Sequence, residues 1–153
     1  MPRLLIIAHA PLASALKAVA AHTFPDEAGA LRVVDVTADM APEQIEALAR
    51  AELPGEDDDD PDALVFADMF GATPANVAQR LCDGHRVRAV AGVNVPMLWR
   101  TLGYASRGAR LDELFARALQ GGAQGVLPVT STRPQNQPIP PNGHDPDHHH
   151  HQQ

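Results

Sequence analysis

Apolar residues along the chain fall either in short unbroken runs or at helical spacing. Two runs, Leu4–Ala8 and Ala63–Ala67, are apolar throughout, which is typical of strands buried on both faces of a parallel sheet. Two further runs, Leu31–Val36 and Val87–Ala91, are rich in β-branched residues and also favour strands. The pattern therefore predicts four strands of one sheet.

Segments with one apolar face follow each of these strands. They predict helices over Leu12–Ala21, Pro42–Leu53, Thr73–Asp83, Pro96–Leu102 and Leu111–Leu119. Gly84 is expected to cap the third of these helices, and Gly121-Gly122 to close the last. The segments 24–29 and 103–110 are expected to be loops. Regular strand–helix alternation predicts an α/β fold, with a doubly wound, mainly parallel four-stranded sheet and helices on both faces.

The C-terminal part of the chain has a different pattern. Val126–Val129 predicts a short last strand, and its Pro128 marks an edge. Beyond Thr130 the chain is rich in proline and histidine with few apolar residues, so residues 1–130 are expected to form the domain and 131–153 a disordered tail. The run His148–His151 is not expected to be a native metal site, because flexible histidines without supporting groups bind metals unselectively.

Charge and composition exclude several classes of function. The net charge of −7 disfavours nucleic-acid binding, and the acidic stretch Glu56–Asp62 is expected to be a solvated loop and not a metal site. The single cysteine, Cys82, excludes an internal disulfide. We find no signal peptide and no apolar stretch of membrane-spanning length. The sequence therefore predicts a cytoplasmic, soluble protein without metal or cofactor.

Two of the buried strands end at ionisable residues, His9 and Asp68. If these strands are neighbours in the sheet, their carboxyl ends lie roughly 5 Å apart. The carboxylate can then accept a hydrogen bond from one imidazole nitrogen, which leaves the other nitrogen as a nucleophile. A serine-type triad is disfavoured because no serine or cysteine occupies a comparable position, and no glycine-rich dinucleotide motif follows the first strand.

A helix start follows Asp68 closely. Gly71-Ala72-Thr73 leads into Pro74, with Thr73 expected at the N-cap and the proline at the first helical position. The free N–H groups and the hydroxyl of such a turn favour an anion. Together with the histidine and the carboxylate, this turn suggests capture of a phosphoryl group on His9.

Three blocks, Ile6–Leu16, Asp68–Ala78 and Gly92–Leu98, resemble the mannose-type enzyme IIA of the bacterial sugar phosphotransferase system in order and spacing. The resemblance covers about residues 1 to 130. It implies that His9 is phosphorylated, that Asp68 is its hydrogen-bonded partner and that the hydroxyl of Thr73 lies at the phosphate, beside Gly71 and Ala72. The chain departs from the usual family residues at Ala8, Ala10 and Ala72-Thr73, but a hydroxyl is retained at the helix start.

The same resemblance implies partners. The donor would be the small phosphocarrier HPr and the acceptor a IIB component, which we expect to be a separate protein. It also implies a homodimer in which the strand 126–129 is exchanged. Two alternatives stay open: a regulatory phosphocarrier without a transport role, and the IIA-like subunit of a dihydroxyacetone kinase, against which the Gly92–Leu98 block favours the mannose type.

Overall fold

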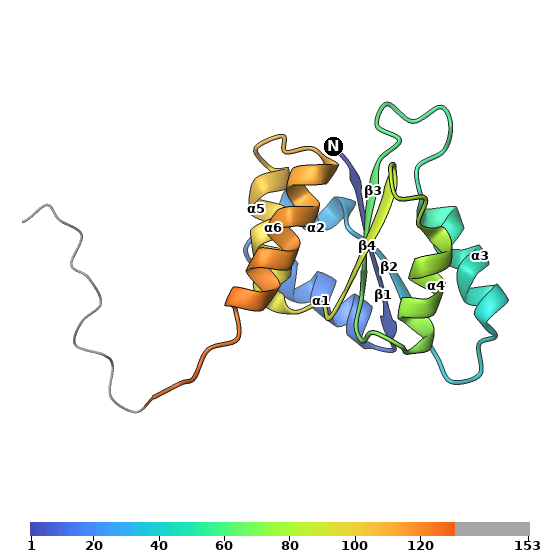
Figure 1. Cartoon of the computed structure of the whole chain (residues 1–153), viewed down its shortest axis with the longest axis horizontal. Coiled ribbons are helices and arrows are strands. Elements are labelled where there is room, and N and C mark those ends of the chain that lie inside the picture. Colours follow the sequence, from blue (N-terminus) through green and yellow to red (C-terminus); the bar gives the residue numbers. More distant parts are fainter. Residues whose placement is uncertain (131–153) are drawn as a thin grey trace, which may run out of the picture.

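The computed structural model describes residues 1–130, so the predicted disordered tail and its His148–His151 run lie outside the described residues. The described chain is an open α/β domain with helices on both faces of one sheet (Figure 1). Its elements in chain order are β1 (Arg3–His9), α1 (Leu12–Ala21), α2 (Pro25–Ala30), β2 (Arg32–Val36), α3 (Pro42–Glu52), β3 (Ala63–Ala67), α4 (Thr73–Leu81), β4 (Val87–Ala91), α5 (Val95–Ala105) and α6 (Leu111–Gln124).

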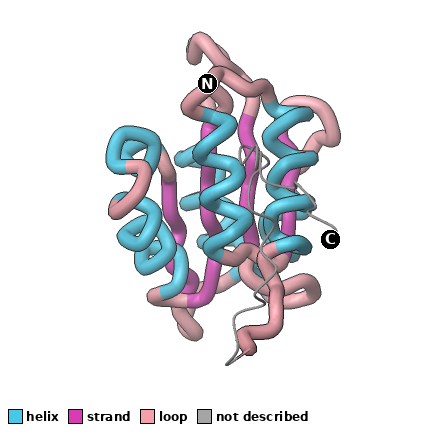
Figure 2. Tube along the Cα trace, turned by 90° about the vertical axis from the view of Figure 1, so that its left-hand side faces the viewer, coloured by secondary structure: helices cyan, strands magenta, loops and turns pink. Residues whose placement is uncertain are grey.

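All four strands are parallel and stand in the order β2-β1-β3-β4, which confirms the predicted fold class. Helices α1, α2, α5 and α6 cover one face and α3 and α4 the other (Figure 1). Viewed from the α5–α6 side, the strands run side by side behind the helices (Figure 2). Because β1 and β3 are neighbours, with Ile7 paired to Ala67, the ends of these strands meet at one edge of the sheet.

The central strand β1 explains why its sequence is apolar without interruption. Leu4 and Ile6 pack with Phe66 in the core beneath α1, α5 and α6. Leu5 and Ile7 point the other way, into the core beneath α3 and α4. Each fully buried side chain of this size contributes about 1.5–3 kcal/mol, so both faces of the sheet hold the strand in register.

The structure corrects several of the sequence-based elements. Helix α4 ends at Leu81 and does not continue to Asp83 as predicted. The segment 24–29, expected to be a loop, contains the short helix α2 with Pro25 in its first turn. Helix α5 extends to Ala105 and so takes up the first part of the predicted loop 103–110. The strand expected over 126–129 is not present in the single chain, where residues 126–130 have no regular structure and Val126, Leu127 and Val129 are exposed.

Gly121 and Gly122 were expected to close the last helix but lie inside α6, which continues to Gln124. Both are buried, and their nearest neighbours belong to α5. A Cβ atom on Gly121 would lie 2.6 Å from the Cβ of Arg100, and one on Gly122 would lie 2.6 Å from Met97 Cε. The two glycines therefore allow the helices to approach closely, and their helix-breaking tendency is overridden by packing.

We expect Gly121→Ala to destabilise the protein by about 1–3 kcal/mol, because the new methyl group meets Arg100 Cβ and the Pro96 carbonyl. Gly29→Ala is the matched control, since nothing lies within 4 Å of its Cβ position, and it should stabilise by about 0.4–1 kcal/mol. Urea unfolding of both variants measures the difference. A Gly121→Ala protein as stable as the parent would contradict the close approach.

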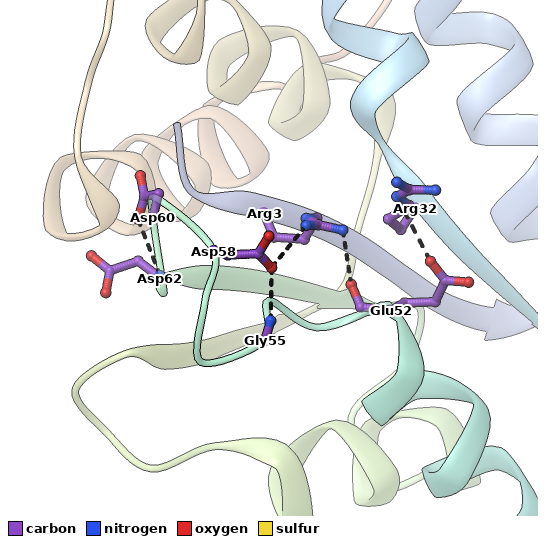
Figure 3. A network of polar contacts seen from close by, with 7 residues as sticks. All are labelled: Arg3, Arg32, Glu52, Gly55, Asp58, Asp60 and Asp62. Atoms are coloured by element: carbon purple, nitrogen blue, oxygen red, sulfur yellow. Dashed lines mark hydrogen bonds and ion pairs between the residues drawn. The ribbon is translucent and has the colours of Figure 1, made fainter.

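The acidic loop after α3 lies at the amino ends of the central strands, near the N-terminus of the chain (Figure 1). Asp58 is tied to Arg3 at 3.4 Å and accepts the Gly55 N–H at 2.7 Å (Figure 3). Asp60 pairs with the amino terminus at 3.1 Å. These carboxylates thus hold the loop to β1 and to the amino terminus that precedes it. No helix within residues 1–130 is both long and apolar enough to cross a membrane.

Candidate functional site

His9 and Asp68 meet at the carboxyl edge of the sheet, as the sequence predicts. His9 is the last residue of β1, and Asp68 directly follows β3. The Nδ1 atom of His9 lies 2.7 Å from Asp68 Oδ2, and the His9 backbone N–H donates to the same oxygen at 2.9 Å. The two side chains differ in exposure, with 56% for His9 and 11% for Asp68. A mostly buried carboxylate therefore holds one nitrogen of an exposed ring.

The hydrogen bonds of Asp68 determine its charge. Burial by itself raises the pKa of the Asp68 carboxyl. The His9 backbone N–H, the His9 ring and the Met69 N–H, which donates to Oδ1 at 2.8 Å, outweigh burial and keep the pKa below its usual value of 3.8. Asp68 is consequently an anion at neutral pH.

The ionised carboxylate in turn sets the tautomer of His9. A carboxylate anion only accepts hydrogen bonds, so the proton of the neutral imidazole must sit on Nδ1. The lone pair of Nε2 is then free, and the exposure of the ring leaves it open to solvent. The arrangement is that of an oriented nitrogen nucleophile.

The turn expected to cradle an anion lies directly after Asp68, but its capping differs from the prediction. Ala72, with φ −86° and ψ 165°, is the N-cap of α4, and Thr73 is the first helical residue. Ala72 has no side-chain group that could cap the helix, and the Thr73 hydroxyl does not occupy the capping position. Gly71 has a φ of +85°, a conformation that favours glycine. Thr73 is not hydrogen-bonded to the His9–Asp68 pair within residues 1–130, so the structure unites His9 with Asp68 only.

Asp35 is a second carboxylate at this edge that sequence reasoning missed. It lies in β2 in register with Ala8 and accepts hydrogen bonds from the backbone N–H (3.1 Å) and the hydroxyl of Ser14, in the first turn of α1. The pair ties the start of α1 to β2, just after the loop that follows His9. A single carboxylate within the apolar run 33–36 was the signal available in the sequence.

Asn94 gives the Gly92–Leu98 block a structural role. Its Oδ1 accepts the Met97 N–H at 2.9 Å and so caps α5, while its Nδ2 donates to the Gly122 carbonyl at 3.1 Å. The residue therefore begins α5 and joins it to α6. Its contacts are structural, and none of them reaches His9.

No group of three or more histidine, cysteine, aspartate or glutamate side chains suited to a metal ion occurs within residues 1–130. The site brings together one imidazole, that of His9, and the carboxylate of Asp68 that holds it. A chemistry that uses the imidazole itself is the one this geometry supports.

Similar proteins share this architecture. The mannose/sorbose specific IIA subunit of the phosphotransferase system from Enterococcus faecalis is 26% identical, with a TM-score of 0.71 over 86% of this chain and 97% of that one. The phosphotransferase component EIIA of Streptococcus agalactiae, at 18% identity, shares the fold with a TM-score of 0.73 over 84% of this chain and 97% of its own.

Sequence comparisons identify the family. The PTS system mannose-specific EIIAB component of Escherichia coli K12 is 39% identical over 64 residues, which make up 41% of this chain and 20% of that protein. The match thus spans about a fifth of the relative's length. The family described as EIIA-man, PTS system fructose IIA component, matches residues 3–119. The chain therefore belongs to the EIIA-man family, the mannose-type IIA components of the sugar phosphotransferase system.

Proposed function

We propose that the protein is a phosphohistidine carrier that accepts a phosphoryl group from an HPr-like donor on His9 and passes it to a IIB component. One observation carries the proposal: the exposed His9 ring is held at Nδ1 by the largely buried Asp68, 2.7 Å away. Family membership supports the same role. The reaction needs no cofactor, and we place it in the cytoplasm, where the donor would be found.

In the transfer step, the lone pair on Nε2 attacks the phosphorus of the donor's phosphohistidine. A new N–P bond forms, the old one breaks, and the donor nitrogen leaves with its electron pair. The Nδ1 proton remains in the hydrogen bond to Asp68 and stabilises the positive charge that develops on the His9 ring. A histidine of the acceptor then attacks the phosphorus, the bond between phosphorus and His9 Nε2 breaks, and the His9 ring returns to its starting state.

The turn 71–73 is proposed to hold the phosphoryl oxygens. Helix α4 begins at Thr73, and the first N–H groups of a helix have no partner within it. The positive end of the helix dipole and the Thr73 hydroxyl would add to this attraction for an anion.

Thr73→Ala is expected to slow phosphoryl uptake by roughly tenfold, the effect of about 1.4 kcal/mol in one hydrogen bond. Its stability should change by less than about 0.5 kcal/mol, because the hydroxyl caps nothing. Asn94→Ala, which removes a real cap, should instead lose about 1–2 kcal/mol. Urea unfolding measures the stability of each variant, and the initial rate of phosphate labelling measures its phosphoryl uptake. A large loss of stability in Thr73→Ala would contradict the assigned role.

The surface around His9 suits a protein partner. Met69 and Phe70, directly after Asp68, are 61% and 88% exposed, and Leu12 at the start of α1 is 39% exposed. Apolar side chains exposed together beside a reactive group are typical of a docking site. A protein donor would be large enough to cover these residues, whereas a small phosphate ester would not.

Incubation with enzyme I, HPr and phosphoenolpyruvate tests the proposed function. We expect acid-labile phosphate on a peptide containing His9, and none when HPr is omitted. The labelled chain, once purified, is offered to a IIB protein or to a dihydroxyacetone kinase. Transfer to the IIB protein supports the proposed role, and transfer to the kinase alone favours the other subunit class.

We further propose a homodimer formed by the segment 126–129. Val126, Leu127 and Val129 are 77%, 74% and 100% exposed in the single chain, and β4 is an edge strand. Beside β4 lies a cavity of about 250 Å³, lined in part by Ala75, Ala89 and Ala91. Pairing of this segment with β4 of a second copy would satisfy its backbone and cover the edge.

Deletion of residues 126–129 is expected to convert a dimer into a monomer or an aggregate, because the exchanged strand would be lost. His9→Ala should remain a dimer. Sedimentation velocity at micromolar concentration distinguishes these states. A parent protein that sediments as a monomer would exclude the exchange without affecting the phosphocarrier chemistry.

A further inference from the structure

Among residues 1–130, the helices that begin at the carboxyl edge of the sheet, each directly after a strand, are α1, α3, α4 and α5. Glu43 lies in the first turn of α3, and the Asn94 side chain caps α5. Helix α4 has neither a side-chain cap nor an acidic residue in its first turn. Helix α1 has neither within its own segment, because Pro11 occupies its N-cap position. Any cap of α1 must therefore come from another element.

Asp35 supplies this cap from the neighbouring strand β2. Ser14 is the third residue of α1, and the first N–H groups of a helix have no carbonyl partner within it. Asp35 Oδ1 accepts the Ser14 N–H at 3.1 Å, and Oδ2 accepts the Ser14 hydroxyl. An N-cap side chain ordinarily accepts the N–H at this same position. Asp35 therefore does for α1 what a polar residue in place of Pro11 would do, and its negative charge suits the positive end of the helix dipole.

The loop between β1 and α1 is held to β2 at both ends. Residues 9–12 are all exposed, so packing against the core does not fix them. Where the loop begins, the Ala10 N–H donates to the Val36 carbonyl at 2.8 Å. Where it ends, Ser14 is bound to Asp35, the residue before Val36. Two consecutive residues of β2 thus anchor this loop.

This loop leaves the sheet at His9, so its anchors help to orient the His9 ring. On the β3 side, Asp68 Oδ2 holds the His9 backbone N–H at 2.9 Å and Nδ1 at 2.7 Å. On the β2 side, Asp35 holds the chain that continues from His9, through Ser14. A reacting group gains rate when it is held in the geometry of the transition state, and a misplacement of about 1 Å can cost about a hundredfold. Both anchors are therefore expected to affect attack by Nε2.

We propose that Asp35 is a positioning residue for phosphoryl transfer by His9 and that it acts by capping α1 from β2. This inference rests on the proposed phosphocarrier function. Within residues 1–130 Asp35 is not hydrogen-bonded to the His9 ring, so it acts through Ser14 and the loop. Because its carboxylate already occupies the positive end of α1, the first turn of α4 is left to attract the phosphoryl oxygens.

Asp35→Ala tests the proposal. We expect the rate of phosphate uptake at saturating HPr to fall by about ten- to a hundredfold, because the loop after His9 loses one of its anchors. Hydrogen exchange of the Ala10 amide should also become faster, since its bond to the Val36 carbonyl would open more often. A rate loss confined to low HPr concentrations would place the effect in docking and contradict the proposal.

Asn94→Ala is the matched control, because Asn94 Oδ1 caps α5 in the same way. It accepts the N–H of Met97, the third residue of that helix. Loss of either cap should lower the stability measured by urea unfolding to a similar extent. Only Asp35→Ala should slow uptake at saturating HPr. An equal loss of rate in both variants would show that lower stability, and not the position of His9, is responsible.

Two further variants test the contact itself. Asp35→Asn should recover most of the rate lost in Asp35→Ala, because asparagine and aspartate are similarly good caps. An Asp35→Asn protein as slow as Asp35→Ala would contradict the capping mechanism. Ser14→Ala loses the hydroxyl contact and keeps the N–H contact, so it should slow uptake less than Asp35→Ala does. Asp35→Ala should have a smaller effect in the Ser14→Ala background than in the parent, because the two residues share one contact.

Failure of this inference is distinguishable from failure of the proposed function. If the parent takes up phosphate through HPr and Asp35→Ala does so at the parent rate, the positioning role is overturned and the phosphocarrier function stands. If the parent takes up no phosphate, the phosphocarrier function itself is rejected. Exchange of the Ala10 amide needs no phosphate, so an unchanged exchange rate in Asp35→Ala would reject the anchoring of the loop on its own.

Discussion

Phosphate uptake is expected to disappear when His9 is replaced by alanine, because no other described histidine stands beside a carboxylate at a strand end. The fold should persist, since the His9 side chain is 56% exposed and the backbone N–H of residue 9 still donates to Asp68. Labelling through HPr, with circular dichroism as a check on folding, measures the result. His85→Ala, an exposed histidine outside the site, is the control and should take up phosphate normally. Label on the His9→Ala protein would reject the assignment.

The second large effect is expected from Asp68→Asn, which should slow phosphoryl uptake by one to two orders of magnitude. A hydrogen bond to a charged group contributes about 1.5–3 kcal/mol, and each 1.4 kcal/mol is a factor of ten in rate. An asparagine amide can also donate to Nδ1, which would place the proton of the neutral ring on Nε2, the attacking nitrogen. The substitution therefore removes the orienting charge and can favour the wrong tautomer.

Initial rates of labelling at several HPr concentrations measure this loss. Asp112→Asn is a suitable control, because Asp112 is an exposed partner of Arg88 away from the site. A loss of rate at saturating HPr would place the effect in the transfer step, and a loss only at low HPr would place it in docking. Transfer at the parent rate in Asp68→Asn would show that the carboxylate does not orient the ring.

Much of the fold follows from the sequence because the central strands are buried on both faces. Their apolar runs can be read without knowledge of their neighbours, and the range of β3 agrees with the prediction. The errors arise where packing overrides local preference. Gly121 and Gly122 read as a helix end, but they lie inside α6 because α5 approaches there.

The candidate site could be predicted only in part. His9 and Asp68 were found because both follow buried strands whose ends meet when the strands are neighbours. Thr73 was misplaced as a cap, since Ala72 occupies the N-cap position. Asp35 was missed because its partner, Ser14, lies on a different element and the contact depends on how α1 packs against β2.

Determining which nitrogen of His9 carries the phosphoryl group tests the central claim most directly. The protein is labelled with ¹⁵N, phosphorylated through HPr, and examined by long-range proton–nitrogen NMR for coupling between phosphorus and the ring nitrogens. Asp68 holds Nδ1, so we expect the N–P bond at Nε2, with the Nδ1 proton retained. Phosphate on Nδ1, or on any other histidine, would contradict the account.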